Sequence, residues 1–195
     1  MALPQTRKTQ SHERIVDVAA RAIRRAGYRG VGVADIMKEA GLTHGGFYAH
    51  FPSRDALLVE AMQKAGSDNQ VALSESMAKR MAKGDSRFAA LVGTYLHDAH
   101  LQQSENGCVV AALASETTRQ SEMVQHEAKR RVTDLVELVR SALPEGVERE
   151  QAQVVAATLV GALQLARTLG GTAGRALLSQ TRKALLLKFQ PTSFS

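Results

Sequence analysis

The sequence predicts an all-α protein of about nine helices, with a small N-terminal head and a larger C-terminal body. Apolar residues recur at spacings of three and four along most of the chain, and no segment alternates as a strand would. Hydrophobic residues make up 44% of the 195 residues, enough for a sizeable core, and there are only four prolines. We expect a flexible basic arm at 1–10, a head at 11–66 and a body at 67–195.

The first predicted helix begins at Ser11, whose hydroxyl suits an N-cap, and ends before Gly27, where a C-cap glycine belongs. One side of this helix carries arginines. The other side carries the apolar stripe Ile15, Val18, Ala19, Ala22, Ile23 and Ala26. The helix is therefore expected to support whatever packs on this stripe.

Two short helices follow, joined by a tight turn at Gly41 and Leu42. The first runs over 33–40, and the second begins after a Thr43 cap and stops near Phe51, because Pro52 follows. A fourth helix begins after Ser53 with Asp55 in its first turn. Two short helices with a glycine turn and a supporting helix predict a helix-turn-helix over about 33–51.

Five further helices are expected in the body. The first follows the break at Gly84 and carries the stripe Phe88, Leu91, Val92, Tyr95 and Ala99. A short helix near Cys108 and a longer one over 121–143 come next. A final pair at 151–169 and 173–189 surrounds Gly170-Gly171.

The second helix of a helix-turn-helix unit enters the major groove of DNA, so its exposed residues are candidate contacts. Phe47 and Phe51 are four residues apart and are expected to pack on the first helix. Gly45 and Gly46 each cost roughly 1 kcal/mol in a helix interior, which is understandable if the backbone lies close to DNA. The predicted DNA contacts are Thr43, His44, Gly45, Gly46, Tyr48, His50 and Arg54, together with Arg7 and Lys8 of the arm.

The distribution of charge favours the same face. The net charge is +6, and residues 1–66 hold ten Lys or Arg against six Asp or Glu. A positive head suits an anionic partner. A helix-turn-helix used only for packing would leave the convergence of Tyr48, His50, Arg54 and the arm unexplained.

The segment GVGVADIMKEAGLTHGGFYAHFPSRDALLVEAM resembles the DNA-binding domain of TetR-family transcriptional regulators. The matching features are the Gly-Leu-Thr turn, the run from Phe47 to Phe51, and Ser53-Arg54-Asp55-x-Leu57. The resemblance is specific over about 11–66. It departs at Gly32, where the family usually has Ser or Thr, and it has Arg54 where Lys is usual. It implies a homodimeric repressor that leaves a pseudo-palindromic operator when a small molecule binds the body.

Family resemblance also implies that the last two helices form a four-helix bundle between two copies. These helices are apolar over much of their circumference, so burial in the monomer core is the alternative. The predicted interface residues are Leu159, Leu163, Leu177, Leu178 and Leu185.

The body offers candidates for an effector pocket. Cys108, Ala112 and Glu116 share one helix face, Tyr95 lies on an inner stripe, and methionines suit apolar ligands. The predicted pocket residues are Met62, Tyr95, Cys108, Ala112, Glu116 and Met123, although core packing is an alternative for the two methionines. No cofactor or metal is expected, because His97 and His100 flank the apolar stripe rather than joining it.

Cys108 is the single cysteine, so no intrachain disulfide can form, which fits a reducing cytoplasm. The N-terminus lacks the apolar core of a signal peptide, and no apolar run approaches the ~18 residues of a membrane span. Asn106-Gly107-Cys108 resembles a subset of the family, which leaves open a thiol-based sensor of oxidants or electrophiles. A cysteine-dependent helical enzyme and an interaction module without DNA affinity are two further hypotheses, but both leave the basic head unexplained.

Overall fold

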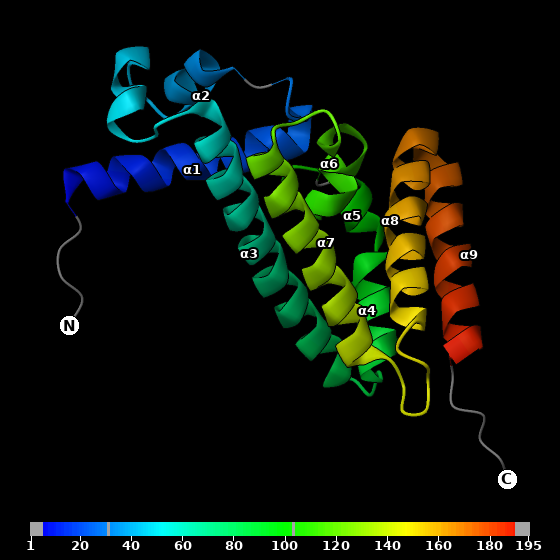
Figure 1. Cartoon of the computed structure of the whole chain (residues 1–195). Coiled ribbons are helices and arrows are strands. Elements are labelled where there is room, and N and C mark those ends of the chain that lie inside the picture. Colours follow the sequence, from blue (N-terminus) through cyan, green and yellow to red (C-terminus); the bar gives the residue numbers. More distant parts are fainter. Residues whose placement is uncertain (1–5, 31, 103, 190–195) are drawn as a thin grey trace, which may run out of the picture. The chain divides into compact units, whose positions relative to one another are not determined.

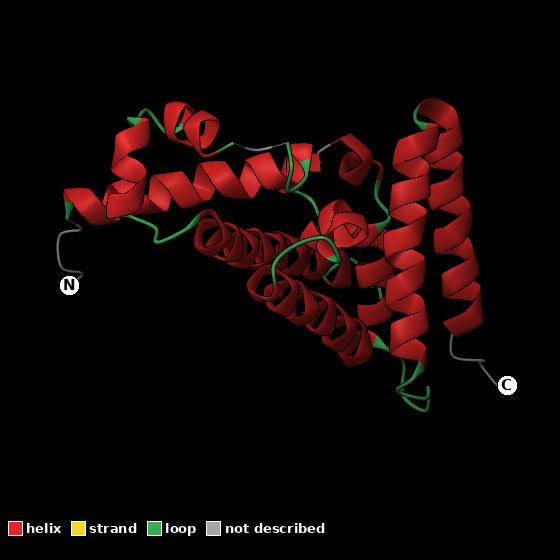
Figure 2. Cartoon of the chain, turned by 45° about the horizontal axis from the view of Figure 1, so that its top comes forward, coloured by secondary structure: helices red, strands yellow, loops and turns green. Residues whose placement is uncertain are grey.

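The computed structural model describes residues 6–30, 32–102 and 104–189, and over these ranges it consists of helices and loops without strands (Figure 2). The all-α prediction is confirmed. The N-terminal elements are α1 (Arg7–Ala26), α2 (Val33–Glu39), the 3₁₀ helix η1 (His44–Ala49) and α3 (Arg54–Met81). The others are α4 (Arg87–Tyr95), α5 (Asp98–Gln102), the 3₁₀ helix η2 (Ser104–Asn106), α6 (Val109–Thr117), α7 (Glu122–Ala142), α8 (Gln151–Leu169) and α9 (Gly171–Phe189).

The first helix begins earlier than its sequence pattern predicts. Thr6 is the N-cap of α1, and its side chain accepts a hydrogen bond from the Thr9 N–H, the role expected of Ser11. Arg7 and Lys8 therefore lie in the first turn of α1 and not in a flexible arm. Residues 1–5 of the predicted arm lie outside the described residues. The other end is as predicted, because Gly27 caps the helix with φ 73°.

α3 continues to Met81, so this helix runs on through the predicted boundary between head and body at residue 66. One other helix boundary differs from the prediction. The helix expected to run from Phe88 through Ala99 instead breaks at Leu96, the C-cap of α4, and α5 starts at Asp98. At this break the His97 ring accepts a bond from the Ala99 N–H, and the His100 ring bonds the Tyr95 carbonyl at 2.8 Å. Both histidines thus serve the local backbone.

Contacts divide the chain into two compact units, which we describe separately. The first unit comprises residues 1–68 and 104–131, and the second comprises 69–103 and 132–195. In the first unit α2 lies against α1, and η1 lies against α2 (Figure 1). Its core contains Ile15 and Ile23 of α1, Phe47 of η1, and Leu57 and Met62 of α3, all at most 2% exposed. This core fixes the helix-turn-helix on α1 and α3.

In the second unit α8 and α9 lie side by side, and α9 also packs on α4 (Figure 1). Phe88 of α4 meets Phe189 of α9 edge to face, with ring centroids 5.2 Å apart. The Arg167 guanidinium donates to the His100 carbonyl at 2.9 Å, and the Arg182 guanidinium donates to the Leu96 carbonyl at 3.5 Å. Arginines of α8 and α9 therefore satisfy backbone acceptors around the break between α4 and α5.

Candidate DNA-binding surface

The turn of the helix-turn-helix is built as the sequence predicts. Gly41 has φ 70°, a conformation that glycine adopts without strain. The Gly41 N–H bonds the Lys38 carbonyl at 3.0 Å, and the Leu42 N–H bonds the Met37 carbonyl at 2.8 Å. These bonds satisfy the last carbonyls of α2 while the chain reverses toward η1.

The second short helix is a 3₁₀ helix and not the α-helix expected. Its first turn closes through the Gly46 N–H and the Thr43 carbonyl at 3.1 Å. Thr43 is the N-cap residue, as predicted, but its side chain makes no capping hydrogen bond. Two adjacent glycines and only six residues give little α-helical preference, which accounts for the tighter form. Thr43 is exposed, and its hydroxyl is not committed to a cap.

Aromatic side chains hold η1 to the rest of the first unit. Phe47 and Phe51 are each 1% exposed and stack with ring centroids 5.6 Å apart. The His12 ring of α1 stacks on Phe51 at 4.5 Å, and its Nε2 bonds a Glu60 carboxylate oxygen of α3 at 2.7 Å. The predicted packing of Phe47 and Phe51 is confirmed. His12 and Glu60 are additional supports that a search for apolar spacing could not find.

The opposite side of η1 is exposed. Tyr48 is 74% exposed and rests edge-on against Phe47, with centroids 5.2 Å apart. His44 and Gly45 are also exposed. A Cβ added to Gly45 would meet nothing within 4 Å, and one added to Gly46 would make only ordinary contacts at 3.7 Å. Within the described part of the chain, packing therefore does not require glycine at Gly45 or at Gly46.

His50 lies half-buried beside this exposed side. Burial is the main cause that lowers the pKa of His50 below its usual value, and the charges of His12 and Lys8 add to the effect. Its Nδ1 is buried and has no hydrogen-bond partner within the described ranges. A neutral ring at physiological pH can still donate one hydrogen bond from Nε2.

Arg54 is tied to the chain's own backbone. Its guanidinium donates to the Tyr28 carbonyl, in the loop between α1 and α2, and the side chain is half-buried. Arg7 and Lys8 are exposed on the first turn of α1. The predicted contacts thus divide into exposed residues on η1 and α1, and an Arg54 that is already bound to Tyr28.

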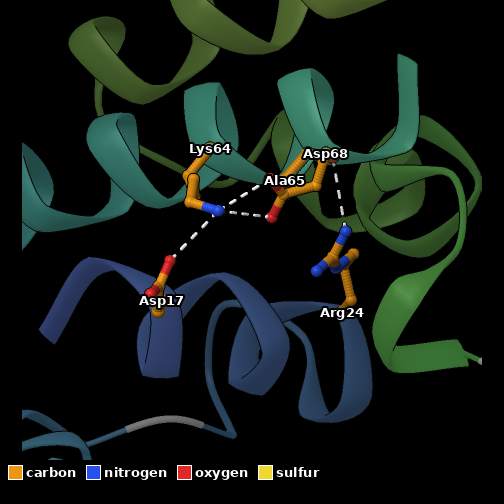
Figure 3. Close-up of polar contacts among 5 residues, drawn as sticks. All are labelled: Asp17, Arg24, Lys64, Ala65 and Asp68. Carbon is orange, nitrogen blue, oxygen red and sulfur yellow. Dashed lines mark hydrogen bonds and ion pairs between the residues drawn. The ribbon is translucent and has the colours of Figure 1, made fainter. Parts of the chain in front are cut away.

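Polar contacts fasten α1 to α3 beneath this surface. Lys64 of α3 lies between Asp17 of α1, at 3.1 Å, and Asp68, at 2.7 Å (Figure 3). Arg24 of α1 is only 5% exposed and donates to the Ala65 carbonyl at 3.3 Å. The spacing of the apolar stripe assigns Arg24 to the polar side of α1. Its burial is decided by α3, whose carbonyl it reaches.

Five of the six predicted effector residues belong to the first unit, and Tyr95 belongs to the second. In the first unit Met62 is buried and accepts a hydrogen bond from the Tyr28 hydroxyl at 3.0 Å, as core packing would require. Met123 is 55% exposed, so it lines no interior pocket in that unit. Cys108 is the buried N-cap residue of α6, and Ala112 is half-buried on the same helix. Tyr95 is buried in the second unit.

Glu116, the remaining candidate, is bound to the DNA-binding side of its unit. Its carboxylate accepts the Tyr28 N–H at 3.1 Å. Two cavities lie in the second unit and have other linings. One of about 410 Å³ is lined by residues of 137–149, and one of about 150 Å³ by Asp98, Leu101, Gln102, Ala166, Arg167, Gly170, Gly171 and Arg175.

Most of the leucines predicted at a dimer interface are buried within the second unit. Leu159, Leu163, Leu178 and Leu185 are at most 7% exposed, and Leu177 is half-buried. The four buried leucines therefore offer almost no surface to a second copy in this protomer, whereas Leu177 is still accessible and the interface itself stays a prediction. On α8 and α9 the exposed large apolar residues are Val154, Leu165, Leu169 and Leu187, all between 52% and 64% exposed.

The expectation that no apolar run approaches a membrane span also needs correction. α8 is 19 residues long, and its most apolar 18-residue window has a mean hydropathy of 1.3 with 39% of it buried. By length and composition alone it could cross a membrane. An exposed apolar face on α8 is unfavourable in water, so the function of the protein has to account for it.

Fold and surface together define a helix-turn-helix DNA-binding regulator. The sequence profile of the bacterial regulatory proteins of the tetR family matches residues 15–61. The profile of the C-terminal domain of LmrA/YxaF-like transcriptional regulators matches residues 86–174. The chain therefore belongs to the TetR family of transcriptional regulators.

Individual relatives agree with this family. The chain is 28% identical over 164 residues to the HTH-type transcriptional regulator LmrA of Bacillus subtilis, covering 81% of this chain and 87% of that protein. It is 26% identical over 145 residues to the HTH-type transcriptional repressor DhaR of a Mycobacterium species, covering 72% and 69%. A TetR-family regulator of Agrobacterium tumefaciens has the same fold, with a TM-score of 0.76, 22% identity, and coverage of 94% and 100%.

Proposed function

We propose that this regulator is a repressor that binds its operator as a homodimer through η1 and the start of α1. The supporting observation is the exposed row Thr43, His44, Gly45 and Tyr48, held in place from behind by the buried Phe47 and Phe51. A rigid backing reduces the entropy lost on binding. The repressor described among its relatives, DhaR, favours repression over activation.

Each exposed group has a proposed role on the duplex. Thr43, Tyr48 and His50 would donate to phosphate oxygens, which fix register, and His44 would meet base edges. Gly45 and Gly46 would let the backbone approach the groove. Arg7 and Lys8 would add charge along the phosphates. Arg54 contributes mainly by holding Tyr28, although a guanidinium with five N–H donors could reach a phosphate as well.

The exposed face of α8 and α9 would carry the dimer contact. On α8 the residues Val154, Ala157, Gly161 and Leu165 follow one another at intervals of three and four, and Leu169 ends the row. Gly161 offers close approach, because a Cβ there would meet nothing within 4 Å in the described protomer. A second copy would cover an apolar helix face that is otherwise left in water. Two-fold symmetry would then place the two heads roughly 34–36 Å apart, one turn of DNA.

The effector would be a small molecule bound by the body in the cytoplasm. Cys108 is a second possibility, as a thiol that reacts with an oxidant or electrophile. It stands at the N-terminus of α6, but it is only 3% exposed, which hinders access. The same burial argues against a cysteine-dependent enzyme. If alkylation of Cys108 leaves operator affinity unchanged, the thiol-sensor hypothesis is rejected.

The decisive experiment is a binding titration on DNA upstream of the protein's own gene, repeated at several salt concentrations. Fluorescence anisotropy would compare that DNA with a scrambled duplex of equal length. We expect specific binding that weakens steeply with salt, because phosphate contacts release counterions. Equal affinity for both duplexes would reject the proposal, and no binding to either would favour an interaction module.

A further inference from the structure

Tyr28, which follows α1, is hydrogen-bonded to side chains of α3 and α6. It follows the end of α1, and its side chain is fully buried. Its N–H donates to Glu116 of α6 at 3.1 Å, its carbonyl accepts from Arg54 of α3, and its hydroxyl donates to the Met62 sulfur at 3.0 Å. Both backbone polar groups of one residue are thus held by side chains from two other helices.

At the end of α1 the backbone adopts a conformation at Gly27 that accommodates the Glu116 side chain. Gly27 has φ 73°, which disfavours any residue with a Cβ. A Cβ at Gly27 would also overlap the Glu116 carboxylate. The backbone conformation therefore demands glycine at this position, and a Cβ there would also displace the Glu116 carboxylate from the corner between α1 and α2.

The position of Glu116 on α6 is unfavourable for α6 itself. It lies one residue before the C-terminal end of the helix, and its own carbonyl accepts the C-cap N–H. A carboxylate near a helix C-terminus is repelled by the negative end of the helix dipole. The bond to the Tyr28 N–H compensates for that repulsion, so Glu116 serves the α1–α2 corner and not its own helix.

A second contact joins the same parts of the first unit. Arg25, near the end of α1, pairs with Glu39 of α2 at 3.3 Å and with Glu105 of η2 at 3.1 Å. These carboxylates are about 40% exposed, so the pairs alone contribute little. Their geometry nevertheless agrees with the Glu116 contact. The segment 104–117 is attached to the corner from which the helix-turn-helix starts.

We infer that Glu116 is a positioning residue for DNA binding, which fixes the α1–α2 corner through the Tyr28 N–H and thereby the placement of α2 and η1. This inference rests on the proposed DNA surface. Glu116 is on α6 and has no place on that surface. Its removal would leave a buried N–H without its partner and loosen the corner, while every proposed DNA contact would remain in the sequence.

The test compares Glu116→Gln with Glu116→Ala in the full chain. The glutamine amide oxygen can still accept the Tyr28 N–H, whereas alanine cannot. We expect Glu116→Ala to weaken operator binding by about tenfold, an effect in the range of mutations that act between sites, while binding to scrambled DNA stays unchanged. Glu116→Gln should keep operator affinity within about threefold of the parent chain.

A destabilised control separates positioning from general loss of folding. Val92→Ala removes buried volume from α4 in the second unit, and it should lower thermal stability without a selective loss of operator binding. Hydrogen exchange at the Tyr28 amide gives a readout that needs no DNA. Protection should fall in Glu116→Ala and persist in Glu116→Gln.

Four outcomes would overturn the inference. If folded Glu116→Ala binds the operator as the parent chain does, or loses specific and non-specific binding equally, the inference is overturned. If Tyr28 stays protected in Glu116→Ala, the contact itself is refuted. If the parent chain shows no operator preference while Tyr28 protection depends on Glu116, the proposed DNA surface fails and the contact is purely structural.

Discussion

His12 and Phe51 stack with their ring centroids 4.5 Å apart, which joins α1 to the chain two residues past the end of η1. The same His12 bonds Glu60 of α3 at 2.7 Å. The proposed recognition element is therefore backed by two helices. Substitutions on its exposed side should change DNA binding without changing stability, and the first two predictions use this separation.

Replacing Tyr48 by Phe should weaken operator binding by about three- to tenfold, the effect of about one lost hydrogen bond. The ring and its contact with Phe47 remain, and the hydroxyl is removed from a side chain that is 74% exposed. The urea midpoint should not move. Anisotropy titrations and urea unfolding would measure both quantities. Val71→Ala, at a similarly exposed site on α3, serves as the control, and an equal loss of affinity there would contradict the assignment.

Replacing Gly45 by Ala should separate stability from function. A Cβ there meets nothing within 4 Å and Gly45 has no positive φ, so unfolding should cost the same or up to about 1 kcal/mol more. Operator affinity should nevertheless fall by tenfold or more, if the backbone lies against the groove. Thermal unfolding and DNA titration of one preparation would test this. An unchanged operator affinity would show that no close approach occurs at Gly45.

Replacing Leu165 by Glu should disrupt the dimer. Leu165 is 61% exposed on α8, so the protomer itself loses little packing. A charge facing its own symmetry mate would be buried without a partner, at a cost of several kcal/mol. Analytical ultracentrifugation should show monomers and the operator titration a large loss of affinity. The matched control is Val132→Glu, an exposed apolar site on α7; dissociation of that variant instead would move the interface.

Stability should fall as the pH drops below the ordinary histidine pKa of about 6.5. Burial is the main cause that lowers the pKa of His100, and the Arg167 charge adds to it. The unfolded chain therefore binds a proton at a pH where the folded chain does not. The stabilising contribution of the neutral His100 is fully present above the histidine pKa of the unfolded chain, and it decreases as the pH falls below that value. His50 contributes in the same direction.

The variant His100→Asn tests this origin. It removes the titrating group, so the slope of unfolding free energy against pH should flatten by at most about 1.4 kcal/mol per pH unit. Urea unfolding between about pH 5 and 8 would measure it. The exposed His126→Asn should keep the parent slope. A His100→Asn profile as steep as the parent profile would place the dependence elsewhere.

The amphipathic repeats and glycine positions of the sequence were sufficient for the helix-turn-helix. Phe47 and Phe51 occupy one face at any near-helical spacing, and Gly27 and Gly41 end helices because of local backbone preference. The start of α1 was misplaced, since Thr6 and Ser11 are both competent caps and only the folded chain shows which one is used.

The dimer and pocket residues are harder to predict from the sequence, because an apolar side chain has the same periodicity whether a neighbouring helix or a second copy covers it. The pairing of α8 with α9 buries Leu159 and Leu178 and leaves Leu165 and Leu187 outside. The pocket candidates stay predictions for a similar reason. Residues on one face of α6 share a direction, but what they face depends on the neighbouring helices.

The sequence by itself determined the all-helical fold, the DNA-binding turn and the exposed residues of η1, because these follow from local spacing and backbone preference. Only the tertiary structure decided the partners of the polar side chains. Arg24, Arg54 and Glu116 look alike in sequence, as charges on helices, yet each reaches a backbone group outside its own helix. Such bonds join residues as far apart as 28 and 116, and no local pattern encodes them.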